Sequence, residues 1–175
     1  NQGDSLEDYL KKVPNSTFLP DADNVIPILD GDWFTDDISE GFRKFLQVAF
    51  GAEHFSENLQ FVESALGKDI RKYFLKDYYS DHLKRYKNRP IYWLFSSPKA
   101  TFNALVYMHR YRPDTVSIVL NDYLREFRTK LSAKLEHLIT VSISTSASQT
   151  EKTKALKEIE NLKKKVDELD TYERD

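Results

Sequence analysis

Two long helical patterns in the last third of the sequence limit the fold most strongly. Apolar residues recur between Val116 and Leu138 with the three- and four-residue spacing of one helix face. After a polar stretch at 142–150, a second series repeats as a heptad seam at Ile159, Leu162, Val166 and Leu169. Residues 113–175 are therefore predicted to form a long antiparallel α-hairpin that resembles a coiled coil.

Upstream of residue 90 the sequence predicts shorter helices. Residues 4–12 are predicted to form a helix that Pro14 ends, and residues 13–34 an irregular, partly extended stretch. The next helix is predicted to have Thr35 as its N-cap and to end at Gly51. Two more are expected, one at 56–66 with Gly67 after it and one from 68 to about 87, in which the pattern allows a break.

The pattern changes at Pro90. Residues 91–95 and 102–108 are rich in β-branched and aromatic residues, and a turn-like spacer separates them. This predicts a β-hairpin near 90–108, which needs further structure to cover it because an isolated hairpin is marginal in water. The predicted fold is mainly α with a small β-hairpin (α+β). We expect two parts, a helical and β-hairpin domain at 1–112 and the α-hairpin at 113–175.

Charge is distributed unevenly along the chain, although the net charge is only −2. Residues 1–67 contain four Lys or Arg against thirteen Asp or Glu, whereas residues 68–112 contain eleven against three. A basic central block at 68–112 suits a surface that meets an anion. The alternative is that the acidic block pairs with the basic block inside the fold, and charge alone does not separate the two.

Motifs for catalysis are absent from these 175 residues. An enzyme that methylates the adenine amino group needs an Asn/Asp-Pro-Pro-aromatic run to hold the flipped base, and no two Pro are adjacent here. The five Gly are scattered, the four His are far apart, and there is no Cys. No apolar run is long enough to span a bilayer. We expect no catalytic, metal-binding or cofactor-binding residue in this chain, and no membrane partner.

Cations and aromatic residues alternate in the basic block, which is typical of nucleic-acid contact through phosphates and stacking. The ordinary alternative is a strand with aromatic residues on both faces and Arg at its ends. The interleaved aromatic residues are Tyr86, Tyr92, Trp93, Tyr107 and Tyr111. The candidate DNA-binding residues are Lys84, Arg85, Lys87, Arg89, Lys99, Arg110 and Arg112.

Long runs in and around this block resemble a known family. The runs are ALGKDIRKYF at 65–74, RPIYWLFSSPK at 89–99, FNALVYMHRY at 102–111, NQGDSLEDYL at 1–10 and DNVIPIL at 23–29. All five resemble PglX-type adenine-specific DNA methyltransferases of BREX phage-defence systems. The resemblance covers essentially the whole chain.

The resemblance implies a parent protein several times longer, whose upstream domain uses S-adenosylmethionine to methylate adenine N6 in a non-palindromic site. We expect this chain to be a C-terminal, non-catalytic fragment of such an enzyme, inactive alone and located in the bacterial cytoplasm. The implied partners are double-stranded DNA, the upstream methyltransferase domain and other defence-system subunits. No catalytic residue is carried over, because none of the family's catalytic motifs matches a position in this chain.

Three functions remain open at this point. The first is a share in DNA recognition, since an enzyme that flips adenine must hold the flanking duplex. The second is a helical spacer or protein-docking module that couples the methyltransferase to other defence subunits without direct DNA contact. The third is a helical interaction module with no DNA role.

Overall fold

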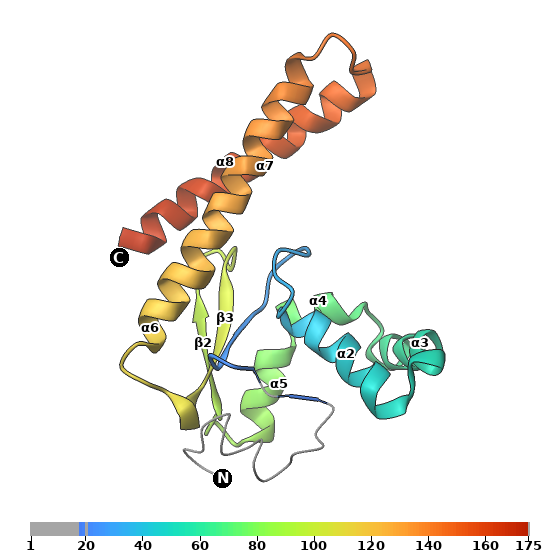
Figure 1. The fold of residues 1–175 in the computed structure, drawn as a ribbon, viewed down its shortest axis with the longest axis vertical. Helices are drawn as coiled ribbons and strands as arrows, with labels where there is room; N and C mark the ends of the chain where they lie inside the picture. Colours follow the sequence, from blue (N-terminus) through green and yellow to red (C-terminus); the bar gives the residue numbers. More distant parts are fainter. Residues whose placement is uncertain (1–17, 20, 175) are drawn as a thin grey trace. The chain divides into compact units, whose positions relative to one another are not determined.

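The computed structural model describes residues 18–19 and 21–174, so the helix predicted at 4–12 lies outside the described residues. The described chain forms two compact units (Figure 1). The first unit runs to Phe95 and also includes Asn103–Thr115, and the second contains Ser96–Phe102 and the residues from Val116 onward. A short loop from the middle of the sequence is thus grouped with the C-terminal helices, which periodicity alone does not indicate.

A three-stranded sheet forms part of the first unit. Strands β2 (Tyr92–Ser96) and β3 (Asn103–Tyr107) confirm the β-hairpin predicted near 90–108. The pattern does not predict the third strand, β1 (Val25–Pro27), which pairs antiparallel with β3 so that Val25 lies opposite Val106. The strand order β1-β3-β2 makes β3 central and β2 an edge strand.

Helices supply the rest of the first unit. Its core is a cluster of Ile28, Ile70, Phe74 and Leu105, all of them buried. This cluster joins the segment after β1 to strand β3 and to helix α4 (Ile70–Lys76). The other described helices of this unit are α2 (Ile38–Phe50), α3 (Phe55–Leu66) and α5 (Tyr78–Arg85).

Local signals explain where these helices begin and end. The prediction of Thr35 as an N-cap is wrong, because Asp37 takes this role and its Oδ1 accepts a hydrogen bond from Ser39 N at 2.8 Å. Gly67 ends α3 in the left-handed conformation, with φ +66°, as glycine after a helix usually does. The helix predicted from 68 to about 87 is divided into α4 and α5 at Asp77.

The second unit contains the predicted α-hairpin. One arm consists of α6 (Thr115–Ile118), a π-helical stretch (Val119–Arg125) and α7 (Glu126–Ile143). The other arm, α8 (Gln149–Arg174), returns along α7 (Figure 1). The mainly α, α+β fold class is therefore confirmed.

Three of the four residues of the predicted seam are buried, and the fourth, Val166, is partly exposed. Ile159, Leu162 and Leu169 on α8 are 7, 4 and 0 % exposed. Phe127 and Leu131 on α7 are buried as well. Among residues 18–19 and 21–174, no helix is both long and apolar enough to cross a membrane.

Candidate nucleic-acid interface

The C-terminal end of α5 has an unusual backbone. Asn88 N donates to Leu83 O at 2.8 Å. Lys87 N donates to Lys84 O at 3.2 Å, which completes the hydrogen-bond pattern of a Schellman cap. Lys87 and Asn88 have φ values of +51° and +60°. Asn tolerates this left-handed conformation, but glycine normally occupies the position of Lys87, so a strained lysine there is a candidate functional residue.

Three cations gather at this helix end. Arg85, Lys87 and Arg89, which we call the α5 cation cluster, are exposed, and no ion pair joins them to another residue in the described part of the chain. Lys84 beside them lies 3.5 Å from Asp81, with side chains 75 % and 51 % exposed. Such an exposed pair contributes little, so Lys84 can also turn to another anion.

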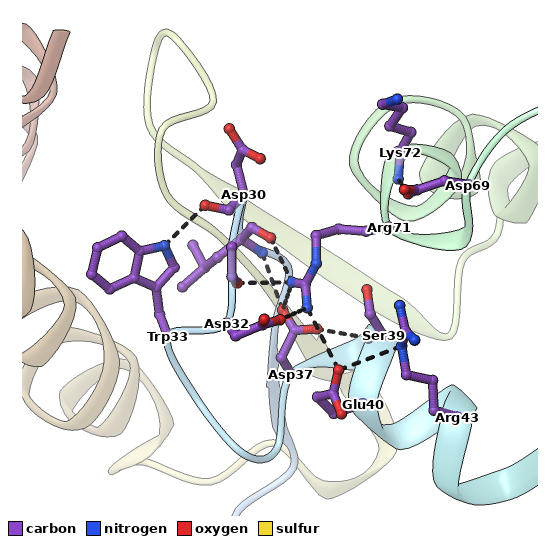
Figure 2. A network of polar contacts seen from close by, with 12 residues as sticks. Asp30, Asp32, Trp33, Asp37, Ser39, Glu40, Arg43, Asp69, Arg71 and Lys72 are labelled. Carbon is purple, nitrogen blue, oxygen red and sulfur yellow. Dashed lines mark hydrogen bonds and ion pairs between the residues drawn. The ribbon is translucent and has the colours of Figure 1, made fainter. Parts of the chain in front are cut away.

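One cation of the basic block, Arg71, does pair with acidic residues of the block at 1–67 inside the fold. Figure 2 shows its guanidinium enclosed by the loop after β1 and the start of α2. Its Nη1 donates to Leu29 O and Gly31 O, both at 2.9 Å. Nη1 also lies 3.1 Å from Asp37 Oδ2, and Nη2 lies 2.6 Å from Asp32 Oδ1. Arg71 is therefore an internal structural cation.

Asp37 is the buried anion of this network, with a side chain 1 % exposed. Burial raises the pKa of its carboxyl, and the Arg71 guanidinium together with the N–H groups of Ser39 and Leu29 opposes that rise. Within the described residues, no comparable acidic group reaches the α5 cation cluster.

The other three predicted DNA-binding residues have different surroundings. Lys99 is exposed in the β2–β3 loop, which belongs to the second unit. Arg110 is half-buried and lines a hollow in the first unit. Arg112 Nε lies 3.2 Å from Asp114 Oδ1, in a pair that is 52 % and 60 % exposed. Lys99 therefore belongs to a different unit from the other six candidates, and the three residues of the α5 cation cluster lie within five residues of one another in the chain.

His82 connects α5 to the start of strand β2 through hydrogen bonds. Its Nε2 accepts hydrogen bonds from Ile91 N at 3.3 Å and Tyr92 N at 3.4 Å. The ring packs against Tyr86, with centroids 4.8 Å apart, and it is buried. Burial lowers the pKa of His82, which keeps Nε2 available as an acceptor. This contact holds both ends of the segment that carries Lys87 and Arg89.

The hollow beside Arg110 has a volume of about 770 Å³, and aromatic, aliphatic and acidic residues line it. Burial, the hydrogen bond to Asp23 and the charge of Asp23 raise the pKa of Asp21 in its wall to about 7. Asp21 Oδ1 already accepts from Asp23 N and Asn24 N at 3.1 and 2.8 Å. Asp21 therefore shapes the turn before β1. Burial also raises the pKa of Tyr78 to about 12, so this phenol is not an acid near neutral pH.

Sequence reasoning missed a carboxylate in the second unit. Glu168 on α8 is 9 % exposed and accepts hydrogen bonds from Lys99 N, at 2.6 Å, and from Thr101 Oγ1. Burial raises the pKa of Glu168, but the bonds from Thr101, Lys99 N and Ser97 outweigh burial and lower it. The contact fixes the backbone of the loop that presents Lys99. Nothing in the sequence signals it, because its partners are distant in the chain.

The arrangement at α5 suits binding of a polyanion. Exposed guanidinium and ammonium groups contact phosphates. No group of three or more His, Asp or Glu among residues 18–19 and 21–174 is placed to hold a metal ion.

Comparison with known proteins confirms the predicted resemblance. The chain is 37 % identical over 172 residues to the adenine-specific methyltransferase BrxX of Escherichia coli O9:H4 (strain HS). It is 38 % identical over 169 residues to the adenine-specific methyltransferase PglX of Lacticaseibacillus casei (strain Zhang). Each match covers 90 % of this chain but only 14 % of the relative, so the chain corresponds to a small part of these proteins. No protein-family model matches the chain.

Proposed function

We infer that the chain is one segment of an adenine-specific DNA methyltransferase of the PglX type, and we propose that this segment contributes to DNA recognition. Similarity along nine-tenths of the chain supports the parentage. The missing Pro-Pro motif supports a non-catalytic role for the segment. In this proposal S-adenosylmethionine is bound by another domain of a cytoplasmic bacterial protein, and DNA is the shared partner.

The α5 cation cluster is the observation that carries the proposal. Arg85, Lys87 and Arg89 present three exposed positive charges within five residues. His82 and the Schellman cap hold the backbone that bears them. Three fixed cations on a short segment match the repeated charge of a DNA backbone, which a binding protein neutralises mainly with Lys and Arg.

A purely structural explanation accounts for only part of the cluster. Cations in the last turn of a helix interact favourably with its dipole, by about 0.3–1 kcal/mol. This explains Lys84 and Arg85, which lie in the last turn of α5. It does not explain Lys87, whose left-handed backbone favours glycine, or Arg89, which lies beyond the cap.

Fluorescence anisotropy on duplex DNA tests the proposal. The 175-residue chain is expected to bind with a dissociation constant of about 10⁻⁴ to 10⁻⁶ M, the non-specific range. The Arg85→Ala/Lys87→Ala/Arg89→Ala variant should bind at least about tenfold more weakly, because a cation that no longer neutralises a phosphate releases no counterion on binding. A control variant, Lys154→Ala/Lys157→Ala/Lys164→Ala, removes three exposed charges from α8 and should bind like the wild type. Equal weakening in both variants, or no binding by the wild type at low salt, rejects the proposal.

A second candidate function is favoured by the far end of the α-hairpin. Near its turn, Ile139, Ile143 and Leu156 are 41, 75 and 55 % exposed. Exposed apolar side chains near one end of a helical hairpin favour a protein-docking surface. The second unit would then act as an arm that couples the methyltransferase to other defence subunits. An Ile143→Lys/Leu156→Lys variant of the parent protein should lose co-purification with those subunits while its DNA affinity is unchanged.

A further inference from the structure

Trp93 is turned away from the core of its own unit. It lies on the edge strand β2 between Tyr92 and Leu94, both of which pack against the core cluster. Because successive residues of a strand point to opposite faces, the Trp93 indole projects from the other face of the strand. Its side chain is 45 % exposed, and within the described residues its indole N–H has no hydrogen-bond partner.

Tyr111 stands beside this indole. The two ring centroids are 5.9 Å apart and the ring planes meet at 66°. Tyr111 is 44 % exposed, so the pair is open to solvent on both members. An edge-to-face pair leaves ring faces uncovered, and a further planar group can stack on them.

Cations lie close to the pair in the sequence. Arg110 and Arg112 lie on either side of Tyr111 in the chain, and Arg89 precedes Trp93 by four residues. The ion pair of Arg112 with Asp114 is half exposed, so it contributes little and the guanidinium can exchange partners. Open aromatic faces with cations close by in the chain fit a ligand that is both planar and anionic, as an unpaired nucleotide is.

We propose that Trp93 and Tyr111 form a stacking platform for an unpaired base of DNA. In an intact duplex the bases stack on each other and present only their edges in the grooves, so the platform selects a strand that has been opened. The platform rests on the proposed function, in which the α5 cation cluster holds the backbone of the same DNA. It adds a preference for unpaired bases that the cluster alone does not supply.

The fluorescence of Trp93 reports directly on binding at the pair. The chain has two Trp, so a Trp33→Phe background leaves Trp93 as the sole source of Trp emission. Titration with a single-stranded oligonucleotide should quench this emission, whereas saturation with a duplex of the same sequence should not. In the chain that retains Trp33, Trp93→Leu should weaken single-strand binding by about tenfold or more, since the base no longer has an indole to stack on. Phe61→Leu, which removes another exposed ring, should leave the affinities for single-stranded and duplex DNA unchanged.

The outcomes separate the platform from the proposed function. Suppose that duplex DNA binds through the α5 cation cluster, that single strands do not change Trp93 emission, and that Trp93→Leu binds single strands as tightly as the wild type. The stacking platform is then wrong, while the proposed role in DNA recognition stands. If neither form of DNA binds, both fail. If Trp93 emission shifts with protein concentration in the absence of DNA, a second copy of the chain covers the pair, and the platform is overturned.

Discussion

Arg71 and Asp37 form a buried ion pair in which Nη1 lies 3.1 Å from Oδ2 and the two side chains are 13 % and 1 % exposed. Arg71 comes from α4 and Asp37 caps α2, so one guanidinium joins two helices to the loop after β1 (Figure 2). Arg71 therefore has a structural role, whereas the cations at the end of α5 are available to a ligand.

Replacement of Arg71 by Met should therefore destabilise the first unit strongly. The change leaves Asp37 buried and unpaired and removes the donors to Leu29 O and Gly31 O. The expected loss is about 3 kcal/mol, the usual cost of breaking a buried pair, measured by urea unfolding at pH 7. Lys68→Met is the control, because its pair with Asp77 is 36 % and 39 % exposed and should cost less than about 1 kcal/mol.

The cost of Arg71→Met should shrink as the pH falls from 7 towards 5. Burial already raises the pKa of Asp37, and loss of the guanidinium raises it further. The folded variant then binds a proton that the unfolded chain does not, so its stability rises as the pH falls. A cost that is constant across this range would show that Asp37 is not the destabilised group.

His82 should make the wild type less stable below about pH 6.5. Burial lowers its pKa in the folded state, so below 6.5 the unfolded chain takes up a proton that the folded chain excludes. The contribution of His82 to stability is fully present above its pKa in the unfolded chain, and it is lost as the pH falls towards its pKa in the folded chain. Asp21, with its raised pKa of about 7, acts in the opposite direction. The measurement is therefore the difference in free energy of unfolding between the wild type and His82→Gln as a function of pH, because the Asp21 contribution cancels in this difference. Parallel curves of stability against pH for the two proteins would refute the role of His82.

Lys87→Gly should stabilise the fold and weaken DNA binding at the same time. Glycine relieves the left-handed strain at φ +51°, which is worth about 1–2 kcal/mol, and loses about 0.5–1 kcal/mol in backbone entropy. The net gain should be about 0.5 kcal/mol in urea unfolding. Lys87→Ala keeps the strain and removes the same charge, so it should lose DNA affinity equally without the gain. Unchanged affinity in both variants would make Lys87 a structural residue only.

Glu168→Ala should loosen the β2–β3 loop within the second unit. It removes the acceptor of Lys99 N and Thr101 Oγ1, and the expected cost is about 1 kcal/mol because two partly buried donors lose their partner. Hydrogen exchange of the Lys99 amide should rise in parallel. Glu160→Ala removes an exposed carboxylate from the same helix and should change stability by less than about 0.5 kcal/mol.

Periodicity explains which parts of the fold were predictable. The α7–α8 seam and the β2–β3 hairpin depend on spacing and local composition, and both are confirmed. Strand β1 is only three residues long and contains Pro27, so it carries no strand pattern of its own. It forms because Val25 meets Val106, a long-range pairing that local sequence does not encode. The cap at Asp37 has the same origin, since its Oδ2 is also held by Arg71.

The surroundings of the candidate residues were not predictable from the sequence. Closeness in the sequence groups Lys99 and Arg110 with the residues at the end of α5. In the structure, Lys99 lies in a loop held by Glu168, and Arg110 lines a hollow. The strain at Lys87 and the exposed pair of Trp93 and Tyr111 depend on backbone angles and strand faces, which become visible only in the folded chain.

The salt dependence of duplex binding tests the central claim most directly. If Arg85, Lys87 and Arg89 each meet one phosphate, log affinity should fall against log salt concentration with a slope of about −3 for the wild type. The Arg85→Ala/Lys87→Ala/Arg89→Ala variant should lose nearly all of this slope, and the Lys154→Ala/Lys157→Ala/Lys164→Ala control should keep it. The same slope in the α5 variant and the wild type would contradict the assignment of DNA contact to the α5 cation cluster.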